Sequence, residues 1–86
     1  MKKIWADEAW DEYLYWQTQD KRTLKKINKL IQSIEREGVL SGEGHPESLK
    51  YRHGYSRKID EKNRLVYDVQ DGLLNIISCK GHYEDK

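Results

Sequence analysis

His82 and Tyr83, two neighbouring residues near the end of the chain, are the first that could carry chemistry. Histidine changes its charge near neutral pH without a strongly perturbing environment, which suits it to proton transfer. A tyrosine ring offers a surface on which a base can stack. Chain ends usually fray and tolerate change, however, so the pair taken alone is more simply interpreted as a solvated tail. The other polar residues must decide between these interpretations.

A long irregular segment carries the next candidates, Glu47 and Lys50. Residues 38–54 contain four glycines and the only proline of the chain, and they show no helical or strand period. A segment of this length in so small a domain tends to be functional unless it is disordered. Pro46 would open a single helical turn over residues 46–50. Taken alone, Glu47 could merely cap that turn.

The strands predicted after this segment add three basic residues: Arg57, Lys58 and Arg64. Arg64 taken alone could be a surface charge at the end of a strand. In an antiparallel meander the last strand runs beside its neighbour, so the chain end and the long segment can meet on one face of the sheet. The sequence therefore predicts one composite site rather than isolated polar residues.

Other familiar kinds of catalytic site are missing from the sequence. The three histidines and the single cysteine do not have zinc-ligand spacing, and no acidic cluster suits a pair of magnesium ions. No glycine-rich phosphate loop precedes a predicted helix. The sequence therefore predicts neither a metal site nor a cofactor.

Length and composition predict one soluble domain, residues 1–86. Charged and apolar residues each make up 36% of the chain, which is enough for one modest core. No apolar run approaches the roughly 20 residues that span a bilayer, and no signal peptide opens the chain, so no membrane contact is expected. The single Cys79 cannot form an internal disulfide, which favours a reducing compartment and a cytoplasmic location.

The net charge of +1 conceals an uneven distribution of charge along the chain. Residues 6–20 hold five acidic residues and no basic one, whereas residues 21–64 hold twelve basic and six acidic residues. A basic face of this kind suits RNA, although a solvated helix face and a basic loop would explain the same numbers.

Hydrophobic periodicity predicts two helices after a short edge strand over residues 2–6. The first helix, residues 6–19, is acidic in its first turn, as the helix dipole favours. Its predicted core stripe is Trp10, Tyr13, Leu14 and Gln17. Asp20 is the predicted N-cap of the second helix, which ends at Gly38. The core stripe of that helix is Leu24, Ile27, Ile31 and Ile34.

Alternating side chains predict strands over residues 55–60 and 63–70, and an Asp71-Gly72 turn leads into a third over residues 73–80. The predicted fold class is α+β. A short N-terminal strand and a two-helix hairpin pack on an antiparallel sheet, which is formed with the C-terminal meander. The helices cover one face of that sheet and leave the other face open for function.

Several motifs, in order and at matching spacing, resemble the YoeB and Txe-type toxins of the RelE superfamily. They extend over nearly the whole chain and are "IWADEAWDEYLYWQTQDKR", "KKINKLI", "HPESLK", "SRKI", "RLVYDV" and "HY". The resemblance implies a RelE-like fold and a bacterial toxin of a type II toxin–antitoxin system. It also implies a metal-independent endoribonuclease that cleaves mRNA in the A site of the ribosome. The implied partner is a YefM or Axe-like antitoxin, and a homodimer stays open.

The resemblance assigns roles to individual residues through these motifs. It implies four catalytic residues, Glu47, Arg64, His82 and Tyr83. It implies three RNA-binding residues, Lys50, Arg57 and Lys58. RNA carries its own nucleophile, the 2′-hydroxyl, so cleavage needs a base, a cation and an acid, which Glu47, Arg64 and His82 fit. The chain departs from the family at Lys58, where an arginine is expected and a bidentate phosphate contact is lost, and in three residues added after the His-Tyr pair.

Two other classes of function stay open. A toxin of the same fold with a target such as gyrase would not need Glu47, Arg64 and His82 together. A non-catalytic module that binds RNA or the ribosome would not need them either. The presence of the full set favours the nuclease.

Overall fold

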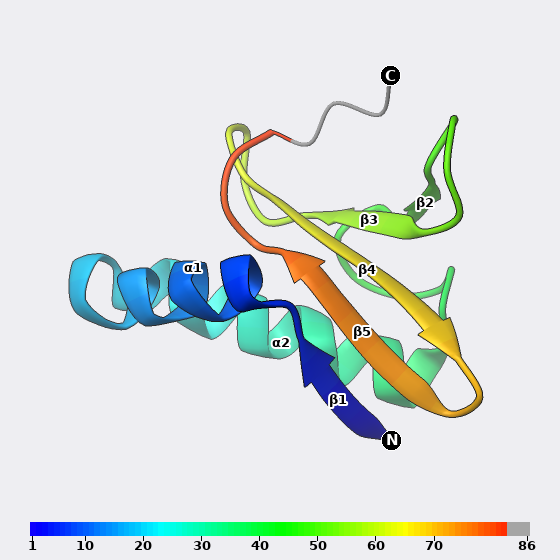
Figure 1. The fold of residues 1–86 in the computed structure, drawn as a ribbon. Helices are drawn as coiled ribbons and strands as arrows, with labels where there is room; N and C mark the ends of the chain where they lie inside the picture. Colours follow the sequence, from blue (N-terminus) through cyan, green and yellow to red (C-terminus); the bar gives the residue numbers. More distant parts are fainter. Residues whose placement is uncertain (83–86) are drawn as a thin grey trace.

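Five strands and two helices make up the fold in the computed structural model, which describes residues 1–82 (Figure 1). In chain order they are β1 (Lys2–Trp5), α1 (Asp7–Gln19), α2 (Lys21–Glu37), β2 (Glu47–Ser48), β3 (Tyr55–Lys58), β4 (Arg64–Gln70) and β5 (Leu73–Ser78). Neither described helix is long and apolar enough to cross a membrane.

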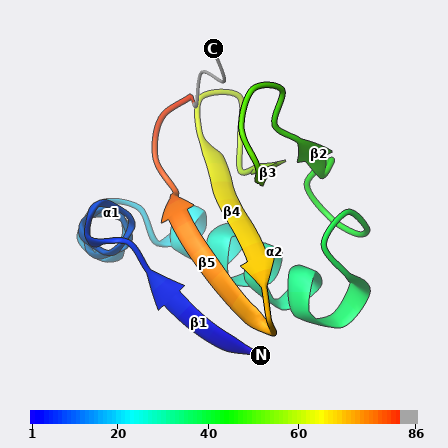
Figure 2. The same ribbon diagram turned by 45° about the vertical axis from the view of Figure 1, so that its right-hand side comes forward.

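The strands form one sheet in the order β1-β5-β4-β3-β2, and both helices lie against the same face of it (Figures 1 and 2). The pairs from β2 to β5 are antiparallel, whereas β1 lies parallel to β5. The predicted α+β fold is confirmed. Its sheet is mixed rather than wholly antiparallel, because β1 reaches the sheet edge beside β5 and only a long crossover connects these two strands.

The α2 helix has the predicted core stripe and the predicted ends. Most of the stripe is buried, together with Leu30, and Leu24 packs against it half-buried. The Asp20 carboxylate accepts hydrogen bonds from the N–H groups of Arg22 and Thr23 at 3.1 and 3.2 Å, which caps the helix. Gly38 ends it with a φ of 110°, a conformation that favours glycine.

The α1 helix buries a different side from the predicted one. Ala9 is fully buried and Trp16 is 8% exposed, whereas Trp10 and Leu14 are 44% and 40% exposed. Trp16 reaches the end of β5, where its Nε1 donates a hydrogen bond to the Cys79 carbonyl at 3.0 Å. The predicted stripe through Trp10 and Leu14 is therefore wrong. Aromatic residues occur all round this helix, so the sequence alone does not select the buried side.

The segment over residues 46–50 is not the predicted helical turn. Glu47 and Ser48 form the short strand β2, which pairs with Ser56 and Tyr55 of β3. The N–H of Leu49 then donates to the Gly54 carbonyl at 2.9 Å. One isolated helical turn fixes many dihedral angles for one hydrogen bond, so pairing with the free edge of β3 is the more favourable arrangement.

The hairpin between β4 and β5 agrees with the prediction. Asp71 and Gly72 both have positive φ values, 52° and 74°. A two-residue turn of this type matches the right-handed twist of the flanking strands. The two strands contribute Leu65, Leu74 and Ile76, which are almost fully buried, to the core that they share with both helices.

Candidate active site

The sheet face opposite the helices carries Glu47, Lys58 and Arg64. Glu47 pairs with Ser56 of β3, and Lys58, two residues further along β3, pairs with Arg64 of β4. Directly paired residues share a face, and so do residues two apart in one strand. The side chains of Glu47, Ser56, Lys58 and Arg64 therefore lie on one face, and Arg57 lies on the other.

The spacing on this face leaves room for a substrate group between the acid and the arginine. Glu47 and Arg64 lie two strands apart and are offset by two residues, so their backbones are about 12 Å apart. Glu47 is exposed and Arg64 is half-buried. A phosphodiester lying over Ser56 and Lys58 is within reach of both long side chains.

Arg57, predicted to bind RNA, lies instead in the layer between sheet and helices. It is 0% exposed, and it is the largest fully buried side chain of the described residues. Its neighbours on the same strand face are Tyr55 and Ile59, which also pack towards the core. The prediction that Arg57 contacts RNA does not fit this position, because no part of its guanidinium reaches the surface.

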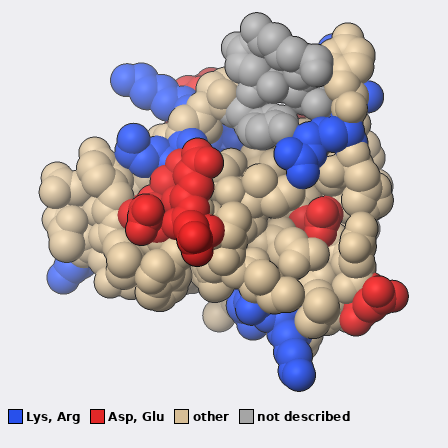
Figure 3. All heavy atoms as spheres, viewed as in Figure 1, with Lys and Arg blue, Asp and Glu red and all other residues tan. Residues whose placement is uncertain are grey.

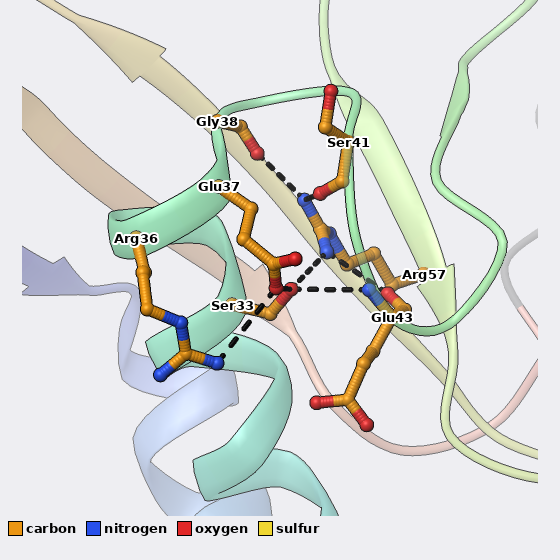
Figure 4. A network of polar contacts seen from close by, with 7 residues as sticks. All are labelled: Ser33, Arg36, Glu37, Gly38, Ser41, Glu43 and Arg57. Carbon is orange, nitrogen blue, oxygen red and sulfur yellow. Dashed lines mark hydrogen bonds and ion pairs between the residues drawn. The ribbon is translucent and has the colours of Figure 1, made fainter.

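Every N–H of the Arg57 guanidinium has an acceptor inside the protein. Figure 4 shows the acceptors of its two terminal nitrogens. The Nε donates to the Tyr67 hydroxyl at 2.9 Å. One terminal nitrogen donates to the Ser33 hydroxyl at 3.0 Å and to the Glu43 carbonyl at 2.9 Å. The other donates at 2.7 Å to the carbonyls of Gly38 and Ser41. Arg57 thus holds residues 38–43, the first part of the long segment, against α2. Glu47 follows four residues later.

Tyr67 extends this set of buried contacts. Its hydroxyl accepts from Arg57 and donates to the Val39 carbonyl at 2.6 Å. Burial raises the pKa of Tyr67, an effect that the nearby Arg57 charge opposes without cancelling. The phenol therefore stays neutral at physiological pH and keeps the proton that it donates.

Lys58 faces the open side but already has an acidic partner. Its Nζ lies 2.8 Å from Oε1 of Glu61, in the turn between β3 and β4. Hydrogen bonding and the charge of Lys58 lower the pKa of the fully exposed Glu61. A surface ion pair of this kind contributes little to stability, so a phosphate can replace the carboxylate at small cost.

Gly81, the residue before His82, is held beside Arg64. The Arg64 N–H donates to the Gly81 carbonyl at 3.0 Å, and the Gly81 N–H donates to Oδ1 of Asn63 at 2.8 Å. His82 follows directly and is exposed. The structure thus brings the backbone of His82 next to that of Arg64, whereas the predicted role of Tyr83 lies outside the described residues.

Lys50 lies in the loop that joins β2 to β3 and is exposed. This loop stands above the open face at the β2 edge of the sheet (Figure 2). A flexible exposed lysine three residues after Glu47 can place its charge over the same face. Its predicted role as an RNA contact stays a prediction.

Acidic residues gather on a different part of the surface, over the start of α1 (Figure 3). Glu8, Asp11 and Glu12 line a shallow pocket there together with Tyr15 and Lys80. Burial raises the pKa of Glu12, although the N–H of Cys79 donates to its Oε1 at 2.7 Å. The acidic residues of the first helix, noted in the sequence, therefore form a patch on the folded surface (Figure 3).

Two further observations concern metal binding and thiol chemistry in the described residues. Residues 1–82 contain no group of three or more His, Cys, Asp or Glu side chains arranged to hold a metal ion. Burial raises the pKa of the Cys79 thiol to about 12, so this cysteine is not a reactive thiolate at neutral pH.

Sequence reasoning missed Asn63, which holds Gly81 from the turn between β3 and β4, and Asp60, which binds the Asn63 amide. The Asp60 carboxylate accepts hydrogen bonds from the N–H groups of Lys62 and Asn63, both at 2.8 Å. An aspartate that accepts from the residues two and three positions later is a common turn signal, visible in "DEKN". Nothing in the sequence indicated that the turn also contacts Gly81.

Comparison with known proteins decides the family. The protein-family model of the YoeB-like toxin of bacterial type II toxin–antitoxin systems matches residues 5–83 of the sequence. The chain belongs to the family of YoeB-like toxins. It is 51% identical to the toxin YoeB of Escherichia coli K12, over 96% of this chain and 100% of that protein. It is 45% identical to the toxin YoeB of a Synechocystis species, over 98% and 99%.

Solved structures of YoeB proteins have the same fold. One is the YoeB of Staphylococcus aureus in a heterotetrameric complex with YefM, which has a TM-score of 0.90 and 45% identity and covers 96% of this chain and 98% of that one. Another is a YoeB dimer from the same organism, with a TM-score of 0.91 and 46% identity over the same shares of the chains. The protein is thus a toxin of a type II toxin–antitoxin system, as the motifs implied.

Proposed function

We propose that this toxin is an endoribonuclease that cleaves mRNA in the A site of the ribosome. The observation that carries the proposal is the strand register that places Glu47, Lys58 and Arg64 on one open face. The hydrogen bonds that hold Gly81 next to Arg64 add His82 to the same end of that face. A base, a fixed cation and an acid are thus available around one phosphodiester.

The reaction that these groups support is attack by the neighbouring 2′-hydroxyl on phosphorus. Glu47 removes the proton of the 2′-hydroxyl as its oxygen bonds to phosphorus, and the bond from phosphorus to the 5′-oxygen breaks. Arg64 stabilises the negative charge that develops on the phosphoryl oxygens. His82 donates a proton to the departing 5′-oxygen. The products are a 2′,3′-cyclic phosphate and a 5′-hydroxyl end.

Lys50, Lys58 and Tyr83 have supporting roles in this proposal. Lys50 and Lys58 add positive charge for the phosphates on either side of the cut, and Lys58 exchanges Glu61 for phosphate when RNA binds. Tyr83 stacks against a base next to the cleaved bond. Because Arg57 is buried with all its donors engaged, it has no place among the RNA contacts.

The ribosome supplies what this open site lacks. Carboxylates are weak bases at neutral pH, so holding the RNA in an attack geometry has to supply much of the rate. Glu47 is exposed in a two-residue strand at the edge of the sheet, so this proposal leaves that positioning to a partner. Message in an occupied A site is therefore the substrate, and free RNA is a poor one.

The first prediction concerns the products and the need for metal. We expect cleavage of message in purified ribosomes to leave 2′,3′-cyclic phosphate and 5′-hydroxyl ends, which mass spectrometry of the fragments measures. A chelator specific for transition metals, used at a magnesium concentration that keeps the ribosomes intact, should not change the rate. The same RNA without ribosomes should be cut far more slowly.

Three results would contradict the proposed function. Fragments with 5′-phosphate ends would rule out attack by the 2′-hydroxyl, and equal rates on free and ribosome-bound RNA would rule out the ribosome as the positioning partner. Growth arrest in cells whose message stays intact would favour the gyrase-type toxin or the non-catalytic ribosome-binding module.

The second prediction concerns the antitoxin. We propose that a YefM-like antitoxin covers the open face with an acidic segment, as its positive side chains favour. Charge reversal at Lys58 and Arg64 should weaken binding at least about tenfold in calorimetry, because it places like charges opposite each other. Reversal at Lys25, which is exposed on α2 away from this face, is the matched control. Equal affinity for both variants would mean that the antitoxin binds elsewhere.

The YoeB of Staphylococcus aureus forms complexes with YefM and also a dimer. Because that relative forms a dimer, we propose that this chain also forms a homodimer. Sedimentation of the free toxin, without antitoxin, measures it directly.

A further inference from the structure

Gly81, the residue immediately before His82, has both of its backbone polar groups engaged. Its N–H donates to Oδ1 of Asn63 at 2.8 Å, and its carbonyl accepts from the N–H of Arg64 at 3.0 Å. Asn63 belongs to the turn between β3 and β4, and Arg64 is the first residue of β4. Gly81 has a φ of 84°, which favours glycine and turns the chain at this point.

The Asn63 side chain can contribute to this arrangement in only one orientation. Its Nδ2 donates to Oδ1 and Oδ2 of Asp60, both at 3.1 Å. A carboxylate only accepts hydrogen bonds, and the Gly81 N–H only donates one. The amide of Asn63 must therefore direct its nitrogen to Asp60 and its oxygen to Gly81. A residue without one donor and one acceptor cannot bridge the two.

Asp60 is itself held in the turn. Its Oδ1 accepts from the N–H groups of Lys62 and Asn63, and the Asn63 carbonyl accepts in return from the N–H of Ile59 at 3.0 Å. Partial burial would raise the pKa of Asp60, but the hydrogen bonds from Asn63 and Lys62 lower it overall. The carboxylate that orients Asn63 is thus ionised at physiological pH.

A second pair of contacts holds the chain two residues earlier. The Cys79 N–H donates to Oε1 of Glu12 at 2.7 Å, and the Cys79 carbonyl accepts from Trp16 Nε1 at 3.0 Å. Between Cys79 and Gly81, the ammonium of Lys80 lies 4.9 Å from the centre of the Tyr15 ring. The segment beyond β5 is therefore guided by α1 on one side and by the turn on the other.

We propose that Asn63, oriented by Asp60, is a positioning residue that sets where His82 stands relative to Arg64. This inference rests on the proposed function, in which His82 donates the proton to the leaving oxygen. Proton transfer requires the donor within about 2.6–3.2 Å of the atom that it protonates. Misplacement by about 1 Å costs on the order of 10²-fold in rate. Asn63 touches no substrate in this role.

The decisive experiment exchanges the two side chains of this pair. Asn63→Asp removes the donor to Asp60 and places a second carboxylate against it. Repulsion between the two carboxylates should turn the side chain at position 63 away, so that the hydrogen bond to the Gly81 N–H is lost. The double variant Asp60→Asn with Asn63→Asp restores one donor and one acceptor in reversed order, and its net charge equals that of the natural chain. The amide at position 60 then donates to the carboxylate at position 63, which accepts from the Gly81 N–H.

Asn75 offers a matched control on the same sheet. Its Nδ2 donates to Oδ1 of Asp68 at 2.7 Å, so Asn75→Asp also places two carboxylates together. This pair bridges β4 and β5 and holds no chain end. Any general effect of such a substitution on stability or charge appears in Asn75→Asp as well.

Two readouts on the free protein test the positioning itself. In Asn63→Asp, we expect the Gly81 amide to exchange with solvent at least about tenfold faster and the ring resonances of His82 to move, because the hydrogen bond that protects and places them is lost. The double variant should restore both, and Asn75→Asp should change neither. Unchanged exchange and unchanged His82 resonances in Asn63→Asp would overturn the proposal.

Cleavage in ribosomes supplies the third readout. Asn63→Asp should lower kcat by about 10- to 100-fold with little change in KM, and the double variant should recover most of it. If His82→Gln abolishes cleavage while Asn63→Asp cleaves at the normal rate, the positioning role is wrong and the proposed function stands. If His82→Gln itself cleaves at the normal rate, the proposed function fails, and amide exchange alone then decides whether Asn63 places the chain end.

Discussion

Replacing Glu47 with glutamine should lower the kcat of message cleavage in ribosomes by about 10²- to 10⁴-fold, the usual contribution of a general base. Glutamine has nearly the same shape but cannot accept the proton of the 2′-hydroxyl. Glu47 is exposed and lies in a strand of only two residues, so the fold should tolerate the change. The affinity for ribosomes should stay the same, because the exposed neighbours of Glu47 are unaltered.

The measurement is single-turnover cleavage, which separates the chemical step from binding and product release. Glu8→Gln is a matched control, since Glu8 is an exposed glutamate in the first turn of α1. The double variant of Glu47→Gln and His82→Gln should lose less than the product of the two single losses, because an acid and a base that act on one transition state are not additive. A normal rate in Glu47→Gln would remove Glu47 from the reaction.

Replacing Arg57 with methionine should lower the free energy of unfolding by about 3 kcal/mol or more. Methionine fills part of the volume but leaves the carbonyls of Gly38, Ser41 and Glu43 without their Arg57 donor (Figure 4). Each buried polar group without a partner costs roughly 1–3 kcal/mol. A domain of this size has a total stability of about 5–15 kcal/mol, so the loss is a large part of it.

Arg57→Lys refines this prediction. Lysine keeps the charge but has three donors on one atom, so it cannot reach acceptors on all sides as the guanidinium does. We expect an intermediate loss of stability, measured as the urea midpoint at constant slope. Arg36→Met is the control in the same part of the fold, because Arg36 is 69% exposed and its ion pair with Glu37 is 3.8 Å long. That variant should change stability by less than about 0.5 kcal/mol.

The Arg57 variants also separate the two interpretations of this residue. An RNA contact would lower affinity for ribosomes and leave stability unchanged. If Arg57 is a buried support for the long segment, replacing it lowers the stability of the fold. Any effect on Glu47 is then indirect, because residues 38–44, which Arg57 holds, precede the strand that contains Glu47. Full stability in Arg57→Met would contradict the contacts described for it.

Local sequence patterns were enough to predict several elements of this fold. The spacing of Ile27, Ile31 and Ile34 predicted the buried side of α2, and Asp20 predicted its start. The Asp71-Gly72 turn was predicted from two residues. These rules work because helix periodicity, capping and tight turns depend on residues within about four positions of one another.

Other features depended on partners far along the chain. The burial of Arg57 requires acceptors 14 to 24 residues away, which only the folded segment supplies. Its alternation with Tyr55 and Ile59 was a usable signal, since the three share a strand face, but the charge of an arginine argued for the surface. Burial became favourable only when every donor had a partner.

The sequence by itself determined the family, the order of most elements and the residue types of the proposed site. The tertiary structure decided which of those residues share a face, through pairings such as Glu47 with Ser56 and Lys58 with Arg64. It also decided that Gly81 lies at Arg64, through the hydrogen bond from Arg64 to Gly81 and the one between Gly81 and Asn63, 18 residues apart. Strand pairing and loop closure of this kind are set by the whole packed chain, because no local pattern records which distant backbone groups will need a partner.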